Sequence, residues 1–208
     1  MAISILVIVD VVSRHKIKQL HQILTTDNEF RSNSTRALMS ENSLLDGIAR
    51  CLEDKEVLER VNILAHTSNV YYQAIAKSKV RIRYLRLLLR KMDSIDDMQL
   101  PEDQANRELI RNRQKAQVEE WQRLARQGKI ERIDVAFYPF EPMVHMLIVD
   151  SKHAVFGINS LEHGFPGVSS ATHDSFVVNG QAEDGRIFIS NLEASFDQIW
   201  NEFSVPRS

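Results

Sequence analysis

The sequence predicts an α/β fold, because runs typical of β-strands alternate with segments that have the apolar spacing of helices. In residues 61–78, the apolar run VNILAH is followed by a polar loop and the helix-like VYYQAIAKS. In residues 79–84, basic and apolar side chains alternate strictly, as on the two faces of a strand. Residues 143–160, MVHMLIVDSKHAVFGINS, read as a strand, a turn and a second strand. With 208 residues and 43% hydrophobic content, the chain can bury one sizeable core.

Composition excludes several classes of partner. The net charge is −2, from 26 basic and 28 acidic side chains, so any site for a polyanion has to be local. Cys51 is the only cysteine, so no intrachain disulfide can form and a reducing, cytoplasmic compartment is expected. The apolar run at residues 3–12 is interrupted by Asp10 and is far shorter than the ~20 residues that span a bilayer. We therefore expect neither a signal peptide nor a membrane partner.

Residues 1–35 form a separate element in the predicted organisation. The β-branched run at 3–12 suits a buried strand, and the following residues have the apolar spacing of a helix. This element is either a strand and helix of the main sheet or an amphipathic element used for dimerisation. The sequence leaves both alternatives open, and residues 36–208 then make up the main domain.

The first candidate ligand site follows the strand at 61–66. A helix is predicted at 43–58 from its apolar stripe, and the strand then leads into the loop residues His66, Thr67 and Ser68. In open α/β sheets, ligands bind beyond the carboxyl ends of strands, which makes this loop a candidate binding site. Capping of the next helix by Ser68 or Asn69 explains the same residues equally well.

The basic strand at 79–89 supplies a second candidate. Arg81 and Arg83 share one face of this strand, which we expect to lie at an edge or end of the sheet. Their face is either simply solvated or directed towards an anionic ligand.

A charged insertion is predicted at 92–127. Its first part is rich in acidic residues, and from about residue 106 to 127 the pattern is that of a largely exposed helix ended by Gly128. This exposed helix could dock a protein partner, which would make the chain a purely structural interaction protein.

The C-terminal part is predicted to hold further strands and a final helix. A strand is expected at 130–140, and the apolar FVVNG at 176–180 suits another. RIFIS, at 186–190, either pairs with it in a hairpin or leads directly into the last helix, for which 192–203 shows an apolar stripe.

This order of elements, together with IVDSKHAVFGIN, resembles one catalytic half of the phospholipase D superfamily, in particular its small single-repeat members. The resemblance spans roughly residues 40–204. It implies a mixed sheet flanked by helices on both faces, and a homodimer, because two motifs are needed to build one active site.

The family's signature is only partly present. Asp150 and Gly157 have its spacing, and Asn159 lies one place before the family's asparagine, next to Ser160. The histidine and lysine positions are occupied by Met143 and His145. In the family, the histidine attacks phosphorus and the lysine stabilises the phosphoryl oxygens, and a methionine can do neither.

The resemblance therefore implies a non-catalytic binding or regulatory module, with Asp150 and Gly157 as structural residues. Its ligand would be a phosphate-containing molecule, a nucleic acid or a protein, bound where the loop at 66–69, the strand face with His145 and residues 157–165 converge. The alternative is an active, metal-independent phosphodiesterase or nuclease that uses His145 as a displaced nucleophile. A third reading makes His145 a buried histidine held by a hydrogen bond. No metal ligands and no cofactor motif are found.

Overall fold

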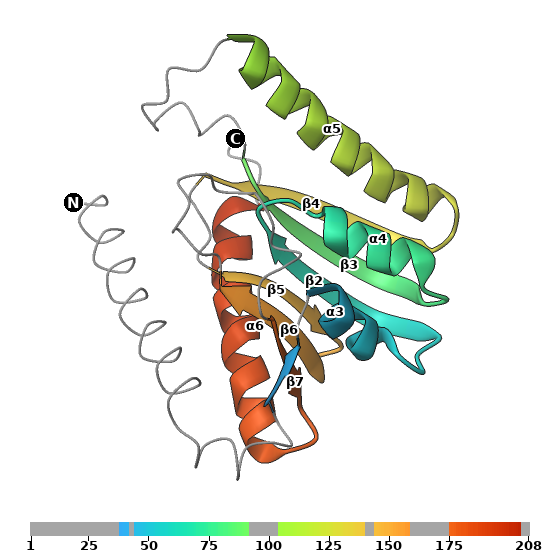
Figure 1. Ribbon diagram of the computed structural model, residues 1–208, viewed down its shortest axis with the longest axis vertical. Helices are drawn as coiled ribbons and strands as arrows, with labels where there is room; N and C mark the ends of the chain where they lie inside the picture. The colour runs from blue at the N-terminus through green and yellow to red at the C-terminus, as the bar shows by residue number, and fades with distance from the viewer. Residues whose placement is uncertain (1–37, 42–43, 92–103, 140–143, 159–174, 205–208) are drawn as a thin grey trace, which may run out of the picture.

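The computed structural model describes residues 38–41, 44–91, 104–139, 144–158 and 175–204. Its elements are, in chain order, β1 (Leu38–Glu41), α3 (Leu44–Leu52), β2 (Val57–Ala65), α4 (Asn69–Lys77), β3 (Arg81–Arg90), α5 (Gln104–Arg126), β4 (Ile130–Tyr138), β5 (Val144–Val149), β6 (His153–Ile158), β7 (Ser175–Asn179) and α6 (Glu183–Phe203) (Figure 1). The predicted element at 1–35, residues 92–103, Met143, Asn159 and Ser160 lie outside the described residues.

The fold is α/β, as the sequence predicts, and is built on one mixed seven-stranded sheet in the order β1-β7-β6-β5-β2-β3-β4. The strands β2, β3 and β4 are parallel, whereas β5, β6, β7 and β1 continue the sheet antiparallel from β2. Parallel neighbours need a crossover connection. The helices α4 and α5 supply the two crossovers, from β2 to β3 and from β3 to β4.

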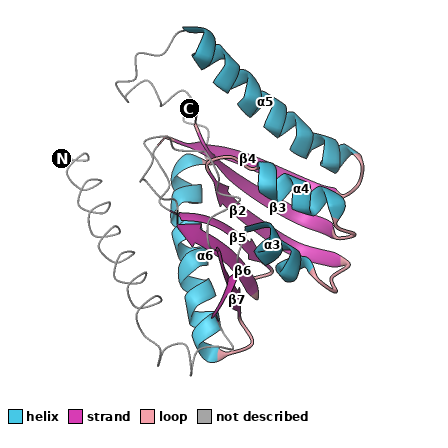
Figure 2. Ribbon diagram, in the orientation of Figure 1, coloured by secondary structure: helices cyan, strands magenta, loops and turns pink. Residues whose placement is uncertain are grey.

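Helices cover both faces of the sheet, which confirms that part of the predicted fold class. Among the described residues, α3, α4 and α5 cover one face and α6 covers the other (Figures 1 and 2). Two apolar clusters fill the two layers. The larger, under α3, α4 and α5, includes Leu85, Trp121 and Leu147, and the smaller, under α6, includes Phe196 and Trp200.

Three details differ from the sequence prediction. The first is that β3 is an interior strand between β2 and β4, so it does not lie at a sheet edge. Its exposed arginines alternate with covered residues only at its beginning, and from Leu85 to Arg90 every residue is buried. The basic alternation thus marks the open end of an interior strand.

RIFIS is the second difference, because it is helical within α6 and forms no hairpin. Glu183 and Asp184 lie in the first turn of α6, where the helix dipole favours negative charge. Ile189, Phe196 and Trp200 are buried at helical spacing. The helix therefore begins at Glu183, well before the predicted start at residue 192.

The third difference concerns the segment at 92–127. Its described helix, α5, is the regular crossover between β3 and β4 and packs on the sheet through Trp121 and Leu124. Gly128 follows it with φ of 75°, a left-handed conformation that ends helices. The helical part of the predicted insertion is thus a component of the α/β fold.

Candidate functional site

The carboxyl ends of the three parallel strands meet at one edge of the sheet. Ala65 pairs with Leu89, and Arg90 pairs with Tyr138, so β2, β3 and β4 end side by side. β5 begins at the same edge, because Met146 pairs with Leu64. This arrangement brings His145 next to the end of β2 and to the loop that carries His66, Thr67 and Ser68. We call this region, defined by residues 65–68, Arg90 and His145, the carboxyl edge.

His145 is buried at the carboxyl edge. Strand alternation places it on the same face as Leu147 and Val149, under α4, and its side chain is 3% exposed. Its Nδ1 lies 2.9 Å from the Tyr71 hydroxyl, in a hydrogen bond whose direction depends on the tautomer of the ring. Burial raises the pKa of Tyr71, so the hydroxyl stays protonated. The imidazole is thus held inside the core by a residue of α4.

Gly157 leaves room for the His145 ring. The two residues are direct partners on the antiparallel strands β5 and β6. A Cβ atom at position 157 would lie 2.4 Å from His145 Nε2 and 2.6 Å from Cε1, which is too close for any real contact. Packing against the His145 ring therefore explains why a glycine occupies position 157.

The loop after β2 is fixed by neighbouring elements. Ser68 precedes α4 at the N-cap position, but its side chain makes no capping bond. Its buried hydroxyl instead accepts a 2.8 Å hydrogen bond from the indole Nε1 of Trp121, on α5. The Tyr138 hydroxyl donates to the Ala65 carbonyl over 3.1 Å. Capping thus does not explain Ser68, which ties the loop to α5.

A histidine and an arginine lie at the carboxyl ends of the adjacent strands β2 and β3. His66 follows β2, and Arg90 ends β3 with 2% exposure. Burial, and then the charge of Arg90, lower the pKa of His66 to about 4. His66 is therefore neutral at pH 7. Lys91 follows Arg90 directly along the chain.

Sequence reasoning missed Arg90, Tyr71 and Trp121 as neighbours of the site. Arg90 follows three leucines, and an arginine at the end of so apolar a strand was a usable signal. Tyr71 and Trp121 were recognisable only as apolar members of helical stripes.

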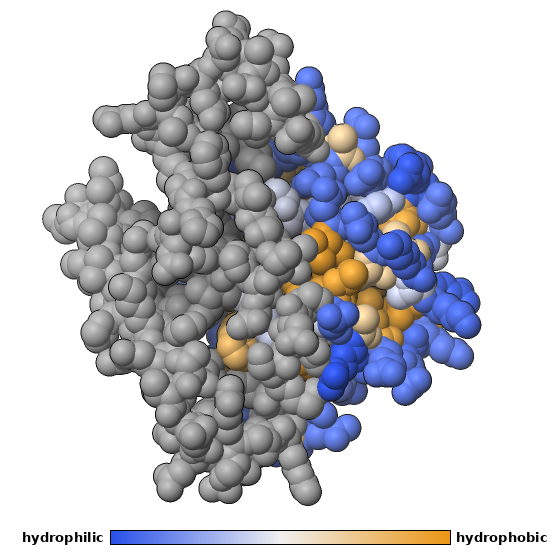
Figure 3. All heavy atoms as spheres, viewed as in Figure 1, coloured by the Kyte–Doolittle hydropathy of each residue, from blue (hydrophilic) through white to orange (hydrophobic). Residues whose placement is uncertain are grey.

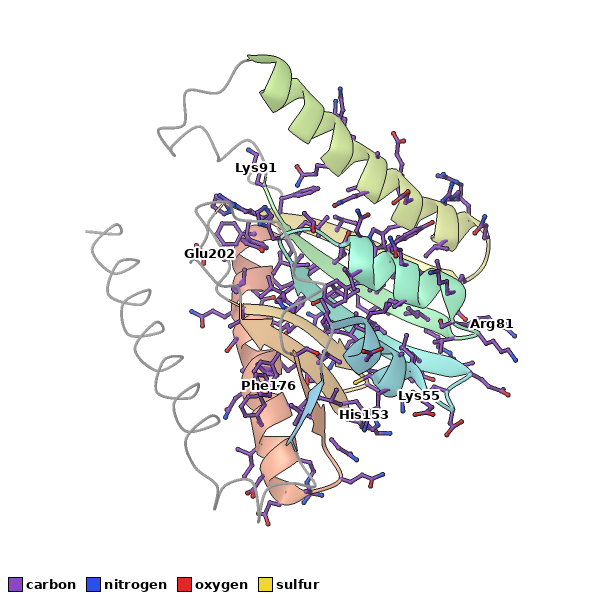
Figure 4. The ribbon with its side chains drawn as sticks, in the orientation of Figure 1. Lys55, Arg81, Lys91, His153, Phe176 and Glu202 are labelled. Atoms are coloured by element: carbon purple, nitrogen blue, oxygen red, sulfur yellow. The ribbon has the colours of Figure 1, made fainter. Side chains whose placement is uncertain are left out.

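Arg81 and Arg83 do not join this site. They begin β3, whereas Arg90 ends it, so about nine residues at ~3.3 Å each separate the two ends. Figure 4 shows Arg81 and Lys91 at opposite ends of this strand. Arg83 pairs with Glu59 over 3.0 Å, with both side chains more than half exposed. The prediction that these arginines help to bind the same ligand as His66 is not supported by their positions.

Asp150 also lies at the far end of the sheet. It occupies the turn between β5 and β6 with φ of 52°. Its Oδ1 accepts a 2.8 Å hydrogen bond from the Arg60 amide, and its own amide donates to the Arg60 carbonyl over 2.9 Å. Asp150 therefore fixes a turn against β2, away from His145.

Metal-binding clusters and membrane-spanning helices are both missing from the described ranges. No group of three or more histidine, cysteine or acidic side chains there is arranged to hold a metal ion. None of the described helices is long and apolar enough to cross a membrane.

Comparisons with known proteins give a distant structural likeness and no sequence match. No protein-family model and no curated protein matches the sequence. Among solved structures, the chain is similar to TrmBL2, described as an archaeal chromatin protein with a novel mode of DNA binding, with 11% identity and a TM-score of 0.40. The match covers 95% of this chain and 64% of the other, so this chain spans less than two thirds of that protein's length. A likeness this distant assigns no family.

Proposed function

We propose that the chain is a non-catalytic, phospholipase D-like binding or regulatory module that takes a phosphate-bearing ligand at the carboxyl edge. The observation that carries the proposal is the burial of His145 against Tyr71 and Gly157. A nucleophile has to reach the phosphorus of its substrate within bonding distance. A ring that is 3% exposed and hydrogen-bonded in the core does not offer that access.

The second support is the residue that would partner a displaced histidine nucleophile. Leu147 stands two residues after His145, where the family's spacing calls for a lysine, and it is fully buried. A leucine cannot stabilise a charged phosphoryl oxygen. In β5, the histidine is thus buried away from a substrate, and the lysine is replaced by a leucine.

The third support is the positive potential of the carboxyl edge. Arg90 is 2% exposed, so it would act on a bound phosphate through its positive charge and not through direct contact. The N-terminus of α4 lies in the same loop and has no acidic residue in its first turn. Helix N-termini favour anions, so α4 adds to the attraction exerted by Arg90. His66 and Thr67 precede this helix directly along the chain.

The test measures binding and cleavage with the same protein. Inorganic phosphate and a short single-stranded oligonucleotide are titrated by calorimetry into the wild type, His66→Ala and Arg83→Ala. We expect weaker binding for His66→Ala and unchanged binding for Arg83→Ala, which alters a basic residue at the other end of the sheet. Equal binding by all three proteins would contradict the assigned site.

The cleavage assay decides between the module and an enzyme. A generic phosphodiester and single-stranded DNA are incubated with the wild type and His145→Ala without metal. We expect no turnover by either protein. Metal-independent cleavage that is lost in His145→Ala would overturn the proposal in favour of a dimeric phosphodiesterase or nuclease. Three further predictions remain: a homodimer, a cytoplasmic location, and a protein partner bound at 92–127. Light scattering tests the homodimer.

A further inference from the structure

The strand β4 forms an edge of the sheet. In the part of the chain that the structure describes, β4 pairs with β3 alone, and no strand pairs with its other side. From Arg132 to Tyr138 its pairing with β3 is continuous. Natural edge strands are commonly protected by proline, charged side chains, bulges or short length. Residues 132–138, RIDVAFY, contain no proline and no lysine, and the two charged side chains among them, Arg132 and Asp134, pair with each other at 2.7 Å.

The backbone of this stretch has its hydrogen-bonding groups turned outwards at alternate residues. The Tyr138 carbonyl accepts from the Lys91 amide over 2.7 Å and so faces β3. Because these directions alternate along a strand, the backbone groups of Ile133, Val135 and Phe137 face away from β3. Three residues thus present amides and carbonyls to a further strand.

The side chains of the same three residues are apolar and incompletely covered. Ile133 and Val135 are partly buried against the core under α5, and Phe137 is 36% exposed. They repeat at every second residue, so they share one face of the sheet. The sequence Ile-x-Val-x-Phe is symmetric in character about Val135. An antiparallel copy of this stretch would therefore set apolar residues opposite apolar residues.

We propose that β4 pairs antiparallel with β4 of a second copy of this chain across a two-fold axis at Val135. In this register, Val135 faces the partner subunit's Val135, and Ile133 faces the partner subunit's Phe137. Each facing pair brings outward backbone groups together and covers apolar surface on the α5 side. Two-fold pairing of one surface with itself is the commonest form of a homodimer.

The charges of β4 are compatible with pairing to a second copy in this register. Arg132 and Asp134 are the charged side chains of this stretch, and they already neutralise each other within one strand at 2.7 Å. The chosen register places each of them opposite an uncharged residue, Tyr138 or Ala136. An axis one residue earlier would set Asp134 against itself, and like charges directly opposite are destabilising. Centring on Val135 avoids that repulsion.

This inference is independent of the proposed ligand site, because β4's outer edge and the carboxyl edge are different surfaces. The first experiment is light scattering on the wild type, Val135→Lys and Ile187→Lys. Ile187 is an exposed apolar residue of α6, at 56% exposure, and serves as the matched control. We expect the wild type and Ile187→Lys to be dimers, and Val135→Lys to be a monomer. A monomeric wild type, or a dimeric Val135→Lys protein, would overturn the inference.

A milder substitution tests the register without relying on the lysine variant's folding. Val135→Cys would place two thiols on strands whose Cα atoms are roughly 5.5 Å apart, within the range that a disulfide spans. Mild oxidation should give a covalent dimer of Val135→Cys and none of Ile187→Cys. Cys51 is buried, and burial raises its pKa to about 12, so it does not compete. A Val135→Cys protein that is dimeric but does not cross-link would exclude this register. Phosphate binding should be unchanged in Val135→Lys, which would show that dimerisation and ligand binding use different surfaces.

Discussion

At the scale of single residues, the His145 ring restricts position 157 on the neighbouring strand to glycine. The imidazole is fixed by Tyr71, so it cannot swing away from the strand β6. A methyl group at position 157 would overlap the ring. Overpacking of this kind costs about 1–3 kcal/mol.

We therefore expect Gly157→Ala to lower the free energy of unfolding by about 1–3 kcal/mol. Urea denaturation of the wild type, both single variants and His145→Ala/Gly157→Ala measures it. In the His145→Ala background the same glycine substitution should cost clearly less, since the clashing ring is gone. Equal costs in both backgrounds would show that the ring is not the obstacle.

His66 gives a prediction about pH. Its folded pKa of about 4 lies below the ordinary value of 6.5, so the unfolded chain takes up the proton first. The stability that comes from a neutral His66 is therefore fully present above pH 6.5 and is lost as pH falls from there towards 4, by about 3 kcal/mol. Unfolding curves at pH 7 and pH 5 should differ less for His66→Gln than for the wild type. A histidine pKa near 6.5 by NMR would contradict the burial that the structure gives this ring.

At the scale of elements, the bond between Trp121 and Ser68 connects α5 to the loop after β2. Both side chains are fully buried. Replacing Trp121 with phenylalanine leaves the Ser68 hydroxyl buried without its donor, which costs about 1–3 kcal/mol beyond the lost packing. The matched variant Trp121→Phe/Ser68→Ala removes both polar partners. We expect the serine substitution to be less harmful, or even stabilising, in the Trp121→Phe background, and chemical denaturation of the four proteins tests it.

Elements with strong periodicity could be predicted from the sequence, and those that depend on tertiary context could not. The strand and turn at 143–160 and the helix ended by Gly128 follow directly from local pattern. RIFIS has strand-like composition, yet the acidic first turn and the apolar spacing of α6 make it helical. The ambiguity was real, since a short apolar run fits either state.

The candidate site was less predictable for a similar reason. Alternation along β5 correctly places His145 on the face with Leu147 and Val149. It carries no information about Tyr71, which approaches from another element and determines whether the imidazole is accessible. Arg81 and Arg90 belong to one strand, but only the topology shows which of its ends meets the loop at 66–68.

At the scale of the whole molecule, a single sheet separates two packed layers, and its burial is uneven. The strands β2, β3 and β5 lie inside the sheet, with apolar residues packed on both faces (Figure 1). On the face shown in Figure 3, apolar side chains gather around α3 and α4, within a largely hydrophilic surface. β4 contrasts with these central strands, since most of its residues reach the surface at least partly along an edge.

This unevenness predicts an order of amide hydrogen exchange. The amides of Ile63, Leu87 and Leu147 should exchange slowest, because their strands are paired on both sides and their side chains are fully buried. The outward amides of Ile133 and Val135 should exchange much faster in dilute protein, where the edge of β4 meets water. Exchange measured by mass spectrometry or NMR at low and high protein concentration checks both statements. The central amides should be insensitive to concentration, whereas self-pairing of β4 would slow its outward amides as concentration rises. Slow, concentration-independent exchange at Ile133 and Val135 would instead mean that the chain itself covers this edge.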